Sequence, residues 1–199
     1  MPRWEPGSTE RLQVAALELF AEQGFEATTV EEIAARAGVT RRTFFRHFPD
    51  KREVLFAGSV TDAPETALVA GIAEADKALI PLQMIAAAIA AYDWDGFAPR
   101  ARQRQRQAVL TANPGLMERE LIKYEAVAVA FADALRQRGV DASAARLAAD
   151  AGIAVLRTAY GRWLAASDDH ADMGQIIADV VATLQSVVAG DVAGRLLVP

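Results

Sequence analysis

The chain has 199 residues, of which 52% are hydrophobic, and a formal net charge of −5. This length suits one large domain or two small ones. Cysteine is absent, which excludes disulfides, thiolate metal sites and a cysteine nucleophile. Neither a basic-then-apolar leader nor an apolar run of spanning length occurs, so we expect a soluble, cytoplasmic protein without a membrane segment.

Residues 8–24 predict a first helix. Ser8 or Thr9 suits its N-cap and Gly24 its end. Its apolar positions recur at helical spacing, at Leu12, Ala15, Ala16, Leu19 and Phe20. Phe25 is expected to enter a small core beside Phe20, Ile33 and Phe44. The residues before Ser8, which include Pro2 and Pro6, are expected to form a frayed arm.

Residues 28–38 predict a short second helix and a sharp turn. Thr29 and Glu32 have the spacing of a capping box, in which each side chain bonds the other residue's backbone N–H. Gly38 is the residue best able to take the left-handed conformation that ends a helix.

Residues 40–48 predict a third helix that carries cations outward. Phe44 and Phe48 are four residues apart and share its inner face. The other side chains must point away from the core: Arg41, Arg42, Thr43, Phe45, Arg46 and His47. From Thr40 to Arg52 there are five Arg or Lys and one Asp, a local charge of five minus one, or +4, in an acidic chain. Such a helix-turn-helix suits the phosphates and the major groove of DNA.

Around these helices the sequence resembles the DNA-binding domain of the TetR family of transcriptional regulators. The matching residues keep a fixed spacing: Leu19 to Phe25, Thr28 to Val30, Ile33-Ala34, Ala37 to Val39, Thr43 to Phe45, His47-Phe48 and Lys51. The resemblance implies an all-α fold, with a helix-turn-helix DNA-binding domain in residues 1–57. Residues 58–199 would form a helical effector-binding and dimerisation domain, and no cofactor, metal or catalytic site is implied.

The outward face and the resemblance together give the candidate DNA-binding residues. Arg41, Arg42 and Thr43 are expected to read base edges. Phosphate contacts are expected from Thr29, Thr40, Arg46, His47 and Lys51, the last of which lies where the family places a phosphate-contacting lysine. The family commonly has tyrosine where this chain has Phe45, so this ring is left to stack on sugar or to contact a thymine methyl.

The rest of the chain is helical in pattern, and strand signals are missing. A fourth helix is predicted to begin at Pro49-Asp50 and to run through Val60, with Asp50 and Glu53 spaced as another capping box. Further helices are predicted over 65–77, 80–94, 99–112, 115–138, 142–167 and 171–189.

Residues 100–107 alternate arginine with alanine or glutamine. Arg100 and Arg104 share one side of a helix, and Arg102 and Arg106 share roughly the other. We favour a solvated bridge between domains, because a helix that is polar all round usually has that role. Two alternatives stay open: an arginine pair binds DNA or ligand phosphate, or the arginines pair with Glu18, Glu22 or Glu26 and couple the domains. Glu118 and Glu120 are interpreted as solvated surface.

The second domain carries aromatic and thioether side chains that suit an apolar effector pocket with a few polar groups. They are Met84, Tyr92, Trp94, Phe97, Met117, Tyr124, Phe131, Tyr160 and Trp163. A packed helical core explains the same pattern, and the sequence does not separate the two. Residues 113–119 and 157–163 resemble regulators of the mycofactocin-regulator type, which implies an acyl-CoA-like effector.

The last two helices have the pattern of an interface. Small residues at Ala144, Ala148 and Ala151 allow close approach, and the apolar face from Ile176 to Val188 is wider than one neighbour needs. In the TetR family these helices pair with their two-fold mates, which implies a homodimer on a palindromic operator. The leading hypothesis is thus a ligand-responsive homodimeric repressor. The alternatives are an enzyme, for which only His47 and His170 are available as histidines, and an interaction module without an effector.

Overall fold

The computed structural model describes residues 7–57, 64–94, 99–167 and 171–190, without the side chains of 64–66. These residues form helices, turns and connections and no strand, which confirms the all-α prediction. By their contacts they divide into two compact units. The first comprises residues 1–63 and 95–123, and the second comprises residues 64–94 and 124–199.

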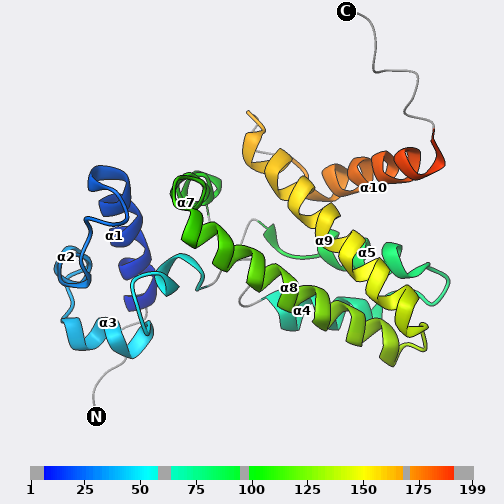
Figure 1. Ribbon diagram of the computed structural model, residues 1–199, viewed down its shortest axis with the longest axis horizontal. Coiled ribbons are helices and arrows are strands. Elements are labelled where there is room, and N and C mark those ends of the chain that lie inside the picture. The colour runs from blue at the N-terminus through cyan, green and yellow to red at the C-terminus, as the bar shows by residue number, and fades with distance from the viewer. Residues whose placement is uncertain (1–6, 58–63, 95–98, 168–170, 191–199) are drawn as a thin grey trace, which may run out of the picture. The chain divides into compact units, whose positions relative to one another are not determined.

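The first unit contains three helices of a helix-turn-helix and a helical pair from later in the chain (Figure 1). The elements are α1 (Ser8–Gln23), α2 (Val30–Arg36), α3 (Arg41–His47), a 3-10 turn η1 (Glu53–Leu55), α7 (Arg100–Ala112) and the beginning of α8 (Pro114–Gln137). The predicted boundary after residue 57 remains a prediction, and residues 95–123 pack in the same unit as the residues before it.

Local signals set the turn between α2 and α3 as predicted. Thr29 and Glu32 form the capping box: the Glu32 N–H donates to Thr29 Oγ1 over 3.2 Å, and the Thr29 N–H donates to Glu32 Oε2 over 2.8 Å. Gly38 has φ +68°. At α1 the predicted cap is wrong, because Gly7 is the N-cap and Ser8 is already helical. Thr9 bonds elsewhere, with its Oγ1 3.1 Å from His47 Nδ1.

The predicted fourth helix is wrong within the described residues, since only the single turn of η1 follows α3 before residue 57. Asp50 does cap this turn, because its Oδ1 accepts from the N–H groups of Arg52 and Glu53 at 2.7 and 3.1 Å. Glu53 does not complete the predicted box: its carboxylate pairs with Arg119 and with Lys123.

One hydrophobic core joins the helix-turn-helix to α7 and α8. Phe25 is buried 5.0 Å from Phe20 between ring centroids, as predicted. Leu110 and Leu116, from α7 and α8, are fully or almost fully buried in the same core. Because these residues share one core, the fold of the helix-turn-helix depends on α7 and α8.

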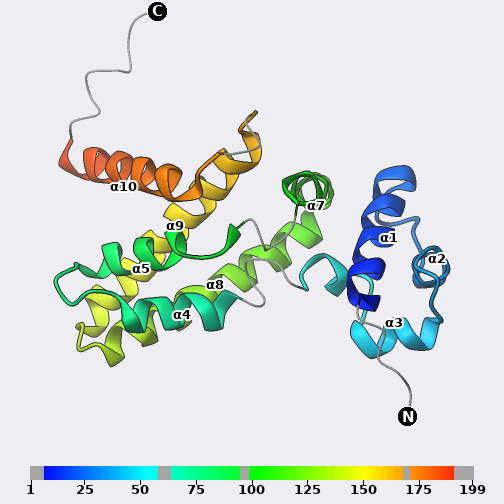
Figure 2. The same ribbon diagram turned by 180° about the vertical axis from the view of Figure 1, so that it is seen from behind.

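The second unit is a layered helical body around α5 (Pro81–Ala90), shown from both sides in Figures 1 and 2. α5 contacts α4 (Pro64–Glu74), α9 (Ala142–Ala165) and α10 (Met173–Ala189). A Cβ added at Gly152 would lie 2.7 Å from Ile85 Cγ2, so glycine permits the close approach of α9 to α5. No helix in the described part of the chain is both long and apolar enough to span a membrane.

Candidate nucleic-acid interface

The seven-residue helix α3 is held at its start and along its inner face. The Thr43 N–H donates to Thr40 Oγ1 over 3.1 Å, which caps the helix. Phe44 and Phe48 are 0% and 2% exposed, and their ring centroids lie 5.6 Å apart. Since so short a helix is marginal alone, these contacts fix which side of α3 faces solvent.

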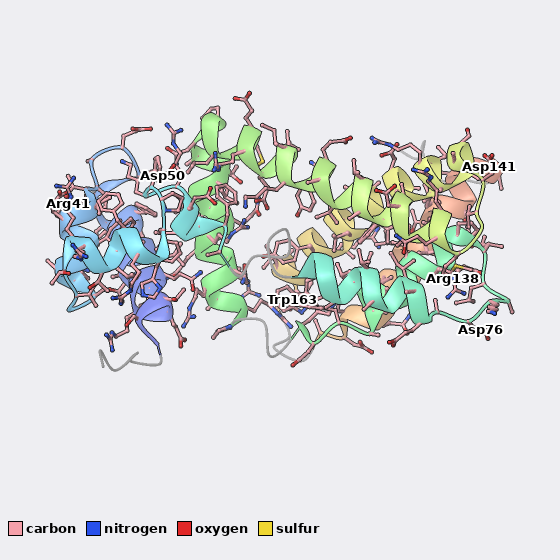
Figure 3. All side chains as sticks on the ribbon, turned by 90° about the horizontal axis from the view of Figure 1, so that it is seen from below. Arg41, Asp50, Asp76, Arg138, Asp141 and Trp163 are labelled. Atoms are coloured by element: carbon pink, nitrogen blue, oxygen red, sulfur yellow. The ribbon has the colours of Figure 1, made fainter. Side chains whose placement is uncertain are left out.

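The outward side of α3 carries most of the predicted DNA-binding residues. Arg41, Arg42, Phe45 and Arg46 are exposed, while Thr43 and His47 are half-buried. Figure 3 shows Arg41 at one end of α3 and Asp50 beyond the other. The hydroxyls of Thr29 and Thr40, both exposed residues, cap α2 and α3. The candidate base-reading and phosphate-binding residues therefore lie around one exposed helix face.

The three arginines of α3 differ in what holds them. Arg41 Nε lies 2.9 Å from Glu31 Oε1, and its guanidinium carbon lies 5.3 Å from the centroid of the Phe45 ring. Arg42 and Arg46, by contrast, form no side-chain hydrogen bond or ion pair with any residue that the structure describes. Arg41 therefore has partners within the protein, and Arg42 and Arg46 have none among the described residues.

Lys51 and His47 make structural contacts that no sequence pattern predicted. Lys51 Nζ donates to the carbonyls of Phe25, Glu26 and Thr28 at 2.7, 3.2 and 3.0 Å. These three bonds close the loop between α1 and α2, where the Lys51 ammonium also lies 4.4 Å from the centroid of the Phe25 ring. His47 joins α3 to α1 through Thr9. The phosphate contacts of Lys51 and His47 remain predictions.

Acidic residues of α1 are neutralised by Arg36 of α2. Arg36 donates to both oxygens of Glu22, at 2.9 and 2.8 Å, and to Glu18 at 3.4 Å. The hydrogen bond from Arg36 lowers the pKa of Glu22 below its ordinary value. Backbone and side-chain donation by Thr29 likewise lowers the pKa of Glu32. Both carboxylates are thus held ionised, and their stabilising contribution is present above the ordinary pKa and lost as the pH falls through the lowered one.

The arginine tract of α7 is not solvated on all sides, so the favoured interpretation as a solvated bridge is wrong. Arg106 is 5% exposed, and its guanidinium pairs with Glu120 across 2.7 Å. Its Nε donates to the Leu55 carbonyl over 2.5 Å. Glu120 is 3% exposed, so its interpretation as solvated surface is also wrong. Arg102 pairs with Glu10 over 3.2 Å, whereas Glu18 and Glu22 pair with Arg36.

A ring of charges surrounds Phe56, which is fully buried directly after η1. Arg106, Arg119 and Lys123 lie 5.5, 6.0 and 5.2 Å from its ring centroid. Glu53 pairs with both Arg119 and Lys123, and Arg119 Nε donates to Glu53 Oε1 over 2.6 Å. We call Leu55, Phe56, Arg106, Glu120, Glu53, Arg119 and Lys123 the charged clasp. It joins η1 to α7 and α8 within the first unit.

In the second unit, four of the predicted effector residues form an aromatic cluster. Trp94 lies 5.1 Å from Tyr92 and 6.2 Å from both Tyr160 and Trp163, between ring centroids. Tyr160 and Trp163 stack at 5.9 Å, and Trp163 is labelled in Figure 3. The indole N–H of Trp94 donates to the Ile89 carbonyl over 2.8 Å. Burial, and then the charge of Asp93, raises the pKa of Tyr92.

The other effector candidates are distributed differently. Met84, Tyr124 and Phe131 are buried in the second unit, and the guanidinium carbon of Arg157 lies 5.6 Å from the Tyr124 ring centroid. Met117 packs against the core of the first unit, whereas the aromatic cluster belongs to the second. Phe97 and His170 lie outside the described residues. Among those described, no group of three or more His, Cys, Asp or Glu is placed to hold a metal ion.

The predicted dimer face is only partly available to a partner. Ile177 and Val180 are 2% and 5% exposed within their own unit. Val187 and Val188, near the end of α10, are 57% and 81% exposed. The apolar surface that a second chain can cover on α10 therefore lies toward its C-terminal end.

The capped turn, the buried phenylalanines and the cationic outward helix define a helix-turn-helix protein of the DNA-binding class. Residues 12–57 match the family model described as bacterial regulatory proteins of the tetR family. This segment is a DNA-binding domain of the TetR family, which confirms the resemblance seen in the sequence.

Two curated relatives and one solved structure illustrate the likeness. The chain is 45% identical over 76 residues to the transcriptional regulator TcmR of Streptomyces glaucescens, covering 38% of this chain and 33% of TcmR. It is 30% identical over 110 residues to MftR of Mycobacterium tuberculosis, a putative mycofactocin biosynthesis regulator, covering 55% and 54%. NalD of Pseudomonas aeruginosa, the secondary repressor of the MexAB-OprM efflux pump, shares the fold at 18% identity and a TM-score of 0.60, covering 89% and 97%. The matched segments span about a third of TcmR and half of MftR.

We expect Arg106→Met and Glu120→Met each to lower the free energy of unfolding by about 3–5 kcal/mol, because each leaves one charge buried without its partner. The double substitution removes both charges, so its cost should be well below the sum of the two. Urea unfolding followed by circular dichroism measures all three changes.

Arg102→Met is the control on the same helix, because its ion pair with Glu10 is more exposed. Its expected cost is about 0–1 kcal/mol. Additive costs in the double variant would contradict the role given to the buried pair.

Proposed function

We propose that the protein is a ligand-responsive transcriptional regulator that binds a palindromic operator as a homodimer and represses transcription until an effector releases it. The observation that carries the DNA-binding part is the outward face of α3, where Arg42 and Arg46 are exposed and have no side-chain partner among the described residues. Phosphate is the ligand that such free cations suit. Since its target is DNA, we expect the protein to act in the bacterial cytoplasm.

Repression and dimerisation are supported by the fold. NalD, which has the same fold, is a repressor. One seven-residue recognition helix reaches few base pairs, so specific binding favours two helices about 34–36 Å apart. The exposed Val187 and Val188 give α10 an apolar surface suited to a second copy.

The effector is proposed to be a small apolar or acyl-type molecule. The cluster of Tyr92, Trp94, Tyr160 and Trp163 offers flat apolar faces and two phenolic hydroxyls, which suits such a ligand. An acyl-CoA would also need cations for its phosphates. Arg102 and Arg106 already pair with Glu10 and Glu120, so they are not available to bind those phosphates. We therefore favour an acyl or apolar effector over one that carries a nucleotide.

Coupling between effector and DNA is proposed to run along α8. Glu120 belongs to the charged clasp and Tyr124, one turn later, belongs to the second unit. A helix transmits a shift along its axis because its turns are hydrogen-bonded to one another. The effector releases DNA only if it binds the non-binding state more tightly.

The Arg41→Ala, Arg42→Ala double variant should lose at least tenfold in affinity for a duplex that the unsubstituted chain selects from a randomised pool, since one bidentate base contact is worth ~1–3 kcal/mol. Fluorescence anisotropy at fixed salt measures the affinity. The Arg136→Ala, Arg146→Ala variant removes the same charge from exposed sites in the second unit and should keep its affinity. Equal affinities for the two variants would refute the assignment.

Val187→Lys with Val188→Lys should shift the protein from dimer to monomer, because four buried charges at a two-fold interface are strongly unfavourable. Light scattering after size exclusion gives the mass, and operator affinity should fall with it. Ile122→Lys, at a residue 64% exposed on α8, is the control and should leave the mass unchanged. A dimer that survives the double change would exclude this face.

Effector binding should change tryptophan emission, because two of the three tryptophans lie in the aromatic cluster. In a Trp4→Phe background, all emission comes from Trp94 and Trp163. Fatty acids, acyl-CoAs and apolar aromatics are titrated while emission, melting temperature and operator release are followed. Compounds that release DNA without altering the emission would place the effector elsewhere.

A further inference from the structure

Arg41 is the one arginine of α3 that is held on two sides. Its Nε pairs with Glu31 Oε1 across 2.9 Å, and its guanidinium carbon lies 5.3 Å from the Phe45 ring centroid. Residues 41 and 45 are one turn apart on α3, so the ring and the cation share a helix face. The guanidinium is therefore bounded by a carboxylate and by an aromatic surface.

Both partners of Arg41 stand on elements that the core and a helix cap hold in place. The Phe45 ring meets the fully buried Phe44 ring edge-on, with centroids 5.4 Å apart and planes at 81°. Glu31 lies in the first turn of α2, next to the Thr29–Glu32 capping box. These two contacts favour one orientation of Arg41 before any ligand arrives, although both members of the ion pair are exposed.

This arrangement determines which nitrogens Arg41 can offer. The Nε side of the guanidinium lies against Glu31 in an ion pair, and the two terminal nitrogens point elsewhere as a planar fork of four N–H donors. A fork of this kind fits guanine, whose O6 and N7 both accept in the major groove. A phosphate needs no such orientation, because a cation on a free stem also binds it.

We propose that Glu31 and Phe45 orient Arg41 to read one guanine, so that Glu31 is a positioning residue that determines sequence specificity. This proposal rests on the DNA-binding function proposed above. It assigns different tasks to chemically identical side chains: Arg41 discriminates bases, and Arg42 and Arg46 supply charge. It also gives Phe45, which lacks the tyrosine hydroxyl common in the family, the task of a platform.

The carboxylate of Glu31 should affect general affinity and base discrimination in opposite directions, which makes the proposal testable. Glu31 repels phosphate, so its removal strengthens binding to any duplex. If Glu31 also positions Arg41, the same removal weakens discrimination at one base pair. The two effects have opposite signs and are measured on different duplexes.

The test uses the full-length chain and a duplex that it selects from a randomised pool, together with every single-base-pair variant of that duplex. Glu31→Ala should lose roughly tenfold in discrimination at one guanine position, the scale of one bidentate contact. Its affinity for a random duplex should stay equal or increase. Glu31→Gln keeps the size of the side chain and loses the charge of the ion pair, so it should recover only part of the discrimination.

Glu22→Ala is the matched control, because it removes the same group from an exposed ion pair with Arg36 on the other side of α2. It should leave discrimination unchanged. Phe45→Leu, which changes no charge, should lose discrimination at the same guanine as Glu31→Ala. Thermal unfolding of each variant confirms that it is folded.

Three results would overturn parts of the argument. Equal strengthening on every duplex by Glu31→Ala, with discrimination intact, would show that Glu31 only competes with DNA. Loss at a thymine in Phe45→Leu would show that the ring reads a methyl group and is not a platform. Failure of the unsubstituted chain to select any duplex would refute the proposed function itself, independently of Glu31.

Discussion

The buried ion pair of Arg106 and Glu120 is the interaction on which the first unit depends. Two charges that are almost completely buried are tolerable only when every donor and acceptor around them is satisfied, because desolvation costs several kcal/mol per ion. Here Arg106 also donates to the Leu55 carbonyl and lies over Phe56. The pair therefore fixes η1, α7 and the beginning of α8 against one another. α3, too short to be stable alone, takes its orientation from the core that these elements complete.

The sequence predicted those features whose causes lie within a few residues. The Thr29–Glu32 capping box, the left-handed Gly38 and the inner pair of Phe44 and Phe48 each follow from a spacing of four or less. The charged clasp was missed because its partners are far apart in the chain, as Glu53 and Arg119 are. A tract with arginine at alternate positions also has no apolar stripe to show that Arg106 is buried. One signal was available: Glu120 lies four residues from both Leu116 and Tyr124, on their inward face.

Fewer cations near α3 are available to DNA than the sequence suggests. Of the five in residues 40–52, Lys51 is bound to three backbone carbonyls and Arg41 to Glu31. A lysine with three donors in use closes the loop between α1 and α2, and its charge still adds to the local field. The other three, Arg42, Arg46 and Arg52, have no side-chain partner in the part of the chain that the structure describes, so their donors are open to a phosphate. Charge alone thus predicts a site for nucleic acid, and the internal partners of each cation decide which task it can perform.

The proposed release mechanism must be consistent with the strength of the charged clasp. Moving a two-state equilibrium from 1:99 to 99:1 requires a ligand that prefers one state by about 5.5 kcal/mol. Separating a buried pair such as Arg106–Glu120 costs on the order of 3–5 kcal/mol, which is most of that difference. An effector that separated this pair would spend most of its binding preference on that step, and little would remain to shift the equilibrium between the two states. A shift that carries η1, α7 and the beginning of α8 together avoids this cost, so the clasp is better suited to transmit a movement than to be the element that switches.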